Sequence, residues 1–269
     1  MRGCVILLSV CIGSPALAGE NWPCLSRKAL SPSFLELSEV TGGQVLMLEP
    51  NEVEKASFAA VQRPFHPETV LRAFGQMDGE VRDYLVPIDS SIESLLISVS
   101  VECNGGIQIK TSQKVDASGE GRTLRQSRIL KVSKPVPGPW RIRLVGRGRF
   151  YVVVEAKTLI SLDRAAMVDG VTGRQQEGWF TSKRAPKLGQ EELWRLDLSG
   201  PATGVRFRLI GGEGQTLSHI DEKPADVNES YIRRITADHE RFRIAADGVD
   251  ERGYPFQRVT KQMVLAARN

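Results

Sequence analysis

Three histidines, His66, His219 and His239, are the imidazoles that could act as a general base or bind a metal. A nucleophilic serine needs such a base beside it, and the sequence has no Gly-x-Ser-x-Gly turn to present one. His239-Glu240 begins like the zinc motif His-Glu-x-x-His, but Arg243 stands where the second histidine is needed. We therefore expect a protein that is not an enzyme and has no cofactor. A pair of glycosidase carboxylates stays open, because distance in space defines such a pair.

Two loops contain groups that can bind cations or phosphate. Asp247, Asp250 and Glu251 lie close together, but the alternating acidic positions of an EF-hand are missing. A solvated hairpin with Gly253 at its tip is the alternative to a calcium loop. The run from Gly211 to Gly214 is better explained as a hairpin turn than as a phosphate cradle. We expect no metal site.

Arginines at alternate positions could bind a polyanion. Arg141 and Arg143 fall in one predicted strand, and Arg206 and Arg208 fall in another. Because side chains alternate along a strand, each pair projects from one face, and stacked pairs would form a cationic stripe. The alternative is an ordinary solvated sheet face with acids nearby. The same alternation recurs at Arg147, Arg149, Arg241 and Arg243.

Residues 1–18 read as a signal peptide. Arg2 precedes an apolar run from Val5 to Ile12 and then Ala16-Leu17-Ala18, the charged, apolar and small-residue order of such leaders. Cleavage after Ala18 predicts a secreted, extracellular protein, and the run is too short to span a membrane. The formal net charge of the whole chain is +4, and losing Arg2 lowers it further. This surplus is too small to predict nucleic-acid binding.

Export would permit two modifications. Cys24 and Cys103 remain after cleavage and could form a disulfide in an oxidising compartment, although two separate thiols are equally compatible with the sequence. Asn228-Glu229-Ser230 fits the N-glycosylation pattern, which matters only in a eukaryotic source.

The elements that would position these residues are mostly short strands. Residues 19–66 read as an α/β fragment, with a helix from Ser33 that stops at Gly42-Gly43, a strand from Gln44 to Leu48 and a short helix from Glu52 to Val61. Beyond it, apolar residues fall at alternate positions, as in half-buried strands. We expect a mainly β protein with two antiparallel sandwich modules, jelly-roll-like at 67–157 and immunoglobulin-like or fibronectin-like at 158–269.

Glycine-containing turns divide the predicted strands. Asn104-Gly105-Gly106 predicts a hairpin after the strand that ends at Cys103, and Gly146-Arg147-Gly148 predicts another turn before Tyr151. Ser98 and Ser100 fall on the outer face of their strand. Trp140 and Trp194 are in phase with the apolar positions and are expected in the cores. Further strands are predicted at 193–198, 205–210, 231–236, 241–246 and 256–265.

Several of these segments resemble a known extracellular family. Thr41-Gly42-Gly43-Gln44-Val45 is similar to the last strand of a von Willebrand factor A domain. Val86 to Ser90, Gly138 to Ile142, Gly148 to Val152 and Arg241 to Ile244 resemble the β-modules that follow that domain in hemicentins and in von Willebrand factor A domain-containing protein 7. The resemblance covers roughly residues 33–269 and implies an adhesion or matrix protein with a protein or glycan partner.

The sequence departs from that family at its metal site. The A domain binds a cation through an Asp-x-Ser-x-Ser loop, and the closest string here, Asp89 to Ser94, has Glu93 at the last hydroxyl position. Metal-dependent adhesion is therefore not implied. Two functions remain: a non-catalytic extracellular interaction or structural protein, and a carbohydrate-binding or polyanion-binding accessory module.

Overall fold

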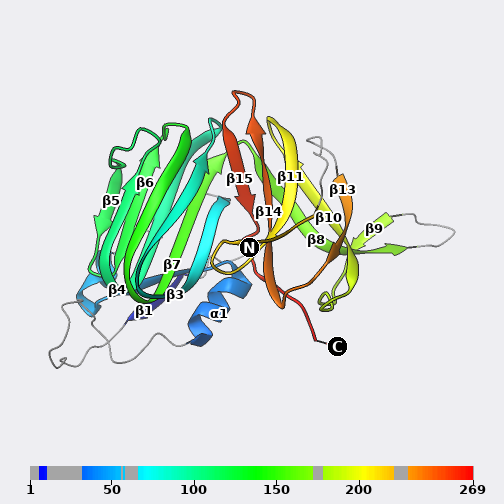
Figure 1. The fold of residues 1–269 in the computed structure, drawn as a ribbon, viewed down its shortest axis with the longest axis horizontal. Coiled ribbons are helices and arrows are strands. Elements are labelled where there is room, and N and C mark those ends of the chain that lie inside the picture. Colours follow the sequence, from blue (N-terminus) through cyan, green and yellow to red (C-terminus); the bar gives the residue numbers. More distant parts are fainter. Residues whose placement is uncertain are drawn as a thin grey trace.

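The protein, shown as a computed structural model in Figure 1, is mainly β, as the alternation of apolar residues predicted. The structure describes residues 6–10, 32–55, 57, 66–171, 178–220 and 230–268. The helical elements include α1 (Pro32–Thr41) and the short 3-10 helix η1 (Pro50–Glu52), and residues 53–55 and 57 are also helical. The strands are β1 (Ile6–Val10), β2 (Gln44–Leu48), β3 (Glu68–Ile88), β4 (Ile92–Lys110), β5 (Glu120–Thr123), β6 (Ser127–Ser133), β7 (Gly138–Thr158), β8 (Ser161–Val171), β9 (Gly178–Thr181), β10 (Glu191–Ser199), β11 (Ala202–Ile210), β12 (Thr216–His219), β13 (Ser230–Thr236), β14 (Arg241–Asp250), β15 (Pro255–Val259) and β16 (Val264–Leu265).

The first module is a single antiparallel sheet, in the order β3-β7-β4-β6-β5, that bends over its own core. The long strands β3, β4 and β7 cross the bend, and the pairing register shifts there in β3 and β4. Tyr84 and Phe150 lie on opposite sides of the bend, yet their ring centroids are 6.1 Å apart. Apolar residues from both halves of the sheet therefore share one core.

Two predicted turns are wrong, because β4 and β7 each continue through their glycines. Asn104 accepts a hydrogen bond from the Gly106 amide at 2.9 Å within a bulge of β4, not within a hairpin loop. Gly146 lies opposite this bulge, where a Cβ would come within 2.6 Å of the Val101 side chain. Gly148 has a φ of 82°. The glycines serve the bend of the sheet, where bulges and close backbone approach require them.

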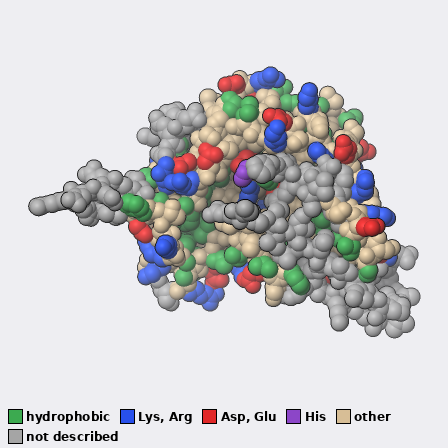
Figure 2. All heavy atoms as spheres, turned by 180° about the vertical axis from the view of Figure 1, so that it is seen from behind, with side chains coloured by type: hydrophobic (Ala, Val, Ile, Leu, Met, Phe, Trp, Pro, Cys, Tyr) green, Lys and Arg blue, Asp and Glu red, His purple; other side chains and the backbone are tan. Residues whose placement is uncertain are grey.

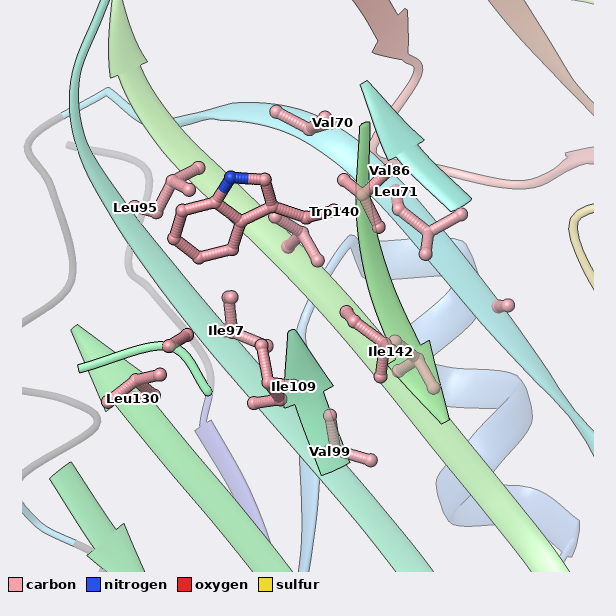
Figure 3. Close-up of a cluster of buried hydrophobic side chains, with 14 of the residues drawn as sticks. Val70, Leu71, Val86, Leu95, Ile97, Val99, Ile109, Leu130, Trp140 and Ile142 are labelled. Atoms are coloured by element: carbon pink, nitrogen blue, oxygen red, sulfur yellow. The ribbon is translucent and has the colours of Figure 1, made fainter. Parts of the chain in front are cut away.

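Trp140 lies in the core of the first module, as its phase predicted. It is 1% exposed and packs among Leu95, Ile97 and Ile142 (Figure 3). Its indole Nε1 donates a hydrogen bond of 2.8 Å to the carbonyl of Val136. The polar end of this large side chain is therefore satisfied, as burial requires.

The second module consists of two sheets, β13-β10-β8-β9 and β12-β11-β14-β15, with β16 paired to β14. Their inner faces share one apolar cluster, in which the rings of Trp194 and Phe242 lie 6.0 Å apart. The expected core position of Trp194 is confirmed at 3% exposure. The Gly211 to Gly214 run forms the turn between β11 and β12, closed by the Gly211 amide donating to the Gln215 carbonyl at 2.9 Å.

The N-terminal elements cover the outer face of the first sheet. β2 buries Leu46 and Leu48 against Leu96 of β4, and α1 packs beside it (Figure 1). The predicted outer positions of Ser98 and Ser100 are consequently buried, which corrects the expectation of a solvated face. Within the predicted leader, Ile6–Val10 forms β1, which pairs parallel with β2. The cleavage position after Ala18 lies outside the described residues.

Candidate functional site

The two modules meet where β15 lies along β3. Gln257 Nε2 of β15 donates to the Val70 carbonyl of β3 at 2.7 Å, deep in the protein. The turn between β11 and β12 also enters this junction, because the Phe74 amide donates to the Gly212 carbonyl at 2.8 Å. A Cβ on Gly212 would lie 2.8 Å from the Phe74 ring. This close approach gives the glycine-rich turn a structural role.

A fully buried ion pair lies at the same junction. Arg258 Nη2 donates to Asp89 Oδ2 at 2.9 Å, and both side chains are 0% exposed. The guanidinium also donates to Thr158 Oγ1 at 2.7 Å and to the Ile160 carbonyl at 2.8 Å. Burial lowers the pKa of Arg258, and the Asp89 carboxylate opposes that shift. The pair joins the β3–β4 turn to the second module.

Asp250 makes a second bridge between the modules. Its Oδ2 accepts hydrogen bonds from the amide and hydroxyl of Ser90, both at 2.6 Å. Its Oδ1 accepts from the amides of Arg252 and Tyr254. Burial raises the pKa of Asp250, but these hydrogen bonds outweigh it and the pKa is lowered. The carboxylate is engaged by protein donors, which favours the hairpin interpretation of this loop over calcium.

The string from Asp89 to Ser94 is likewise a structural turn. Asp89 Oδ1 accepts from the Ser91 amide at 3.2 Å, while Oδ2 accepts from Arg258. Among the described residues, no group of three or more His, Cys, Asp and Glu side chains could hold a metal. His66, His219 and His239 are all exposed.

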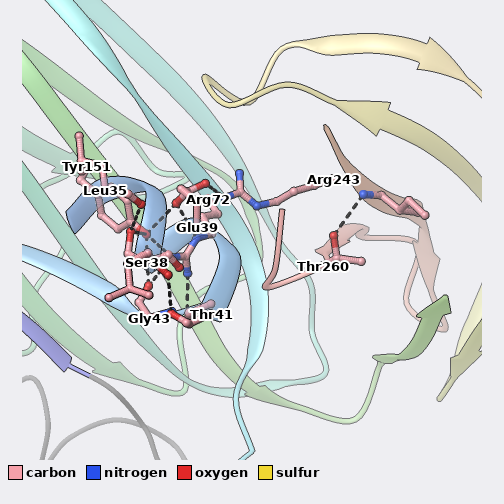
Figure 4. Close-up of polar contacts among 12 residues, drawn as sticks. Leu35, Ser38, Glu39, Thr41, Gly43, Arg72, Tyr151, Arg243 and Thr260 are labelled. Atoms are coloured by element: carbon pink, nitrogen blue, oxygen red, sulfur yellow. Dashed lines mark hydrogen bonds and ion pairs between the residues drawn. The ribbon is translucent and has the colours of Figure 1, made fainter. Parts of the chain in front are cut away.

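A buried polar cluster joins α1 to both modules (Figure 4). Arg72 of β3 donates from Nε to Glu39 Oε1 at 3.2 Å and from Nη2 to the Ser38 carbonyl at 3.0 Å. Its guanidinium also donates to the carbonyls of Gly42 and Gly43. A cation at the carbonyl end of a helix is favourable, because the helix dipole is negative there. Arg72 thus fixes the end of α1 to the first module.

Arg243 reaches the same carboxylate from the second module. Its Nη2 forms an ion pair with Glu39 Oε2, and both side chains are buried. Burial lowers the pKa of Arg243 to about 9, so the guanidinium remains charged at neutral pH. Its Nε and Nη1 have no hydrogen-bond partner among the described residues. The expectation that Arg243 lies on a solvated face beside Arg241 is therefore wrong, because α1 covers this position.

The four arginines proposed as polyanion contacts do not form one stripe. Arg143 is held by Asp83 at 2.7 Å, and Arg208 donates to Asp247 and Gln257. Arg141 and Arg206 are exposed and make no ion pair in the described part of the chain, but they belong to β7 and β11, in different modules. On the rear face, the described basic and acidic side chains are interspersed (Figure 2).

Lys110 is a surface cation that was not among the predicted polyanion contacts. It lies directly opposite Arg141 across the β4–β7 pair, and both side chains are exposed. Alternation predicts Lys110 on the outer face of its strand, and its exposure confirms that. Its register opposite Arg141 depends on long-range pairing.

Cys103 lies in β4. The other three cysteines of the chain, Cys4, Cys11 and Cys24, lie outside the described residues, so the pairing of Cys103 with Cys24 stays a prediction. Asn228 also lies outside them. Within the described ranges, none of the helices has the length and apolar character of a membrane span.

Comparisons with known proteins add little. No family model and no curated protein matches the sequence. The chain is similar to a Bacillus licheniformis lipase crystallised in its propeptide form, with 8% identity over 79% of this chain and 46% of that one and a TM-score of 0.33. It is also similar to the Endo-D glycoside hydrolase domain of Streptococcus pneumoniae R6, with 8% identity, 76% and 36% coverage and a TM-score of 0.20. This chain thus spans less than half of either protein, and neither likeness supports a functional inference. The resemblance to hemicentin-type proteins stays a prediction.

Proposed function

We propose that this protein is a secreted, non-catalytic interaction protein of the adhesion or matrix type. The observation that carries the proposal is the junction between the modules, where Arg258 pairs with Asp89 and Glu39 contacts both Arg72 and Arg243. These buried contacts hold the modules and α1 in one arrangement. A fixed arrangement presents a binding surface without the entropy loss of ordering it, which favours recognition of a partner.

The perturbed ionisable groups also support a binding role. Perturbed pKa values often mark catalytic sites, but structural ion pairs perturb them as well. Here the pKa of Arg258 and that of Glu68 are shifted by burial at the module junction, where Glu68 accepts a 3.1 Å hydrogen bond from the Leu162 amide. Both groups already serve the packing of one module on the other.

A second candidate function, an accessory module that binds a carbohydrate or a polyanion, is favoured by one specific observation. Lys110 and Arg141 face each other directly across the β4–β7 pair. Like charges at opposed positions destabilise a sheet, although Asp116 also lies opposite Lys110 in an isolated β-bridge. An anionic ligand would relieve the repulsion.

The proposal is tested by expressing the full chain and analysing where it goes and what it does. We expect a mature chain that starts at Gly19, outside the cell, and that binds saturably to extracellular material. Incubation with ester, glycoside and peptide substrates should give no turnover. A chain retained inside the cell with residues 1–18 intact, or turnover of any of these substrates, would contradict the proposal.

A further inference from the structure

The basic surplus of the chain is concentrated in two loops of the first module. Residues 110–116 and 134–141 contain four cations, Lys110, Lys114, Lys134 and Arg141, against one acid, Asp116. This local surplus of three compares with a formal net charge of +4 for the whole chain. The remainder is therefore almost balanced. We call these four cations the basic end.

The cations of the basic end are exposed, and Asp116, which lies opposite Lys110 in an isolated β-bridge, is the one acid in these two segments. All four side chains are exposed, and none makes an ion pair within the part of the chain that the structure describes. Arg143, by contrast, lies on the same face of β7 two residues after Arg141 and forms an ion pair with Asp83 at 2.7 Å. At this end of the sheet, Lys110 and Arg141 instead face each other across the β4–β7 pair.

The backbones of the two loops are held together. Ser112 Oγ donates to the Pro137 carbonyl at 3.0 Å, and a Cβ on Gly138 would lie 2.8 Å from the Ser112 Cβ. The buried Trp140 anchors the second loop through its hydrogen bond to the Val136 carbonyl. A loop backbone that is already held in place lowers the entropy cost of bringing the four cations to one ligand.

Two of these lysines also occupy unfavourable backbone conformations. Lys114 has a φ of 62° and Lys134 a φ of 49°, and His66 is the other described non-glycine residue with a positive φ. Glycine would be better for the fold at such positions, because a side chain is strained in the left-handed region. Strain of this kind is often retained where a residue serves function.

We propose that the basic end binds a linear acidic polysaccharide. Sulfate or carboxylate groups would pair with the four cations, and the sugar rings would lie over the side chains of Val115 and Val136. These two side chains are 55% and 45% exposed, respectively. Nucleic-acid sites add aromatic side chains on which bases stack, whereas the exposed apolar residues of this end are aliphatic. The proposal rests on the proposed non-catalytic binding function and names its ligand class.

A charge-removal experiment tests the site. Binding of the full chain to heparin, to polygalacturonate and to single-stranded DNA is measured at low and higher salt. Lys110→Gln/Arg141→Gln should weaken polysaccharide binding about tenfold, since two exposed charge pairs with the ligand are lost. The matched control is Lys183→Gln/Arg206→Gln, which removes two exposed cations of the second module and should leave binding unchanged. Comparing the affinity for heparin with the affinity for polygalacturonate distinguishes recognition of sulfate groups from recognition of carboxylate groups.

Three results would overturn the proposal: no polysaccharide binding by the wild-type chain, equal losses in the two double variants, or DNA bound as tightly as the polysaccharides. Each leaves the proposed function intact, because secretion and absence of turnover are read separately.

A second variant separates function from folding. Lys134→Gly removes a strained side chain and should raise the melting temperature while weakening polysaccharide binding. A more stable variant with unchanged affinity would show that Lys134 takes no part in a site.

Discussion

Removal of the Asp89 carboxylate should destabilise the protein far more than removal of an exposed carboxylate with the same kind of partner. Asp89 and Arg258 are both fully buried. Asp89→Ala leaves a buried guanidinium without its counter-ion, which costs about 3–5 kcal/mol. Asp83 is the matched control, because its pair with Arg143 has side chains that are 35% and 40% exposed. Asp83→Ala should cost only about 0–1 kcal/mol.

Urea and thermal unfolding of the two variants measure this difference. At about 2–4 °C per kcal/mol for a domain of this size, Asp89→Ala should lower the melting temperature by roughly 6–20 °C. Arg258→Met in the same chain should restore part of the loss, because it removes the orphaned charge. Equal losses for Asp89→Ala and Asp83→Ala, or strictly additive effects of Asp89→Ala and Arg258→Met, would refute the reasoning.

Three further predictions concern the bend, the α1 cluster and acid stability. Gly146→Ala should lower the free energy of unfolding by about 1–3 kcal/mol, because the added methyl would lie 2.6 Å from a β4 side chain. Gly106→Ala, whose added methyl meets nothing within 4 Å, should change that free energy by about 0.5 kcal/mol or less. Equal effects of the two variants in urea unfolding would contradict the close approach of the strands at the bend. Arg72→Met should destabilise the protein more than Arg243→Met, because Arg72 also donates to three backbone carbonyls at the end of α1. A larger loss of stability for Arg243→Met in urea unfolding would contradict this role of Arg72. The pKa of Asp250 is lowered in the folded state, so its stabilising effect is present at neutral pH and is lost as the pH falls below the unfolded pKa of about 4. Asp250→Asn should therefore reduce the loss of folding stability at acid pH. An unchanged loss in this variant would show that other groups cause the acid sensitivity.

The alternation of apolar residues located most strands, because a period of two reports directly which side chains face a core. The predicted strands 193–198 and 231–236 lie within β10 and β13. The same reasoning failed at Asn104-Gly105-Gly106 and at Gly146-Arg147-Gly148, because glycine suits a bulge as well as a turn. Only the pairing of β3, β4 and β7 along their whole length decides between these structures, and that pairing is not local.

The buried polar cluster could not be predicted for a related reason. Arg243 follows the same alternation as the exposed arginines, and nothing near it in the sequence indicates burial. Its environment depends on Glu39 of α1, which lies near the other end of the chain. Similarly, Ser100 is buried because β2 covers its face, where the Met47 amide donates to its hydroxyl at 3.3 Å.

Because buried contacts join them, we expect the two modules to move as one rigid body. The distance between spin labels at Gln108 in the first module and Thr203 in the second, two exposed positions, measures this. We predict a single narrow distance distribution in solution, which stays narrow in Asp83→Ala and broadens in Asp89→Ala. A broad distribution in the otherwise unaltered chain would show that the modules move independently and would contradict the claim.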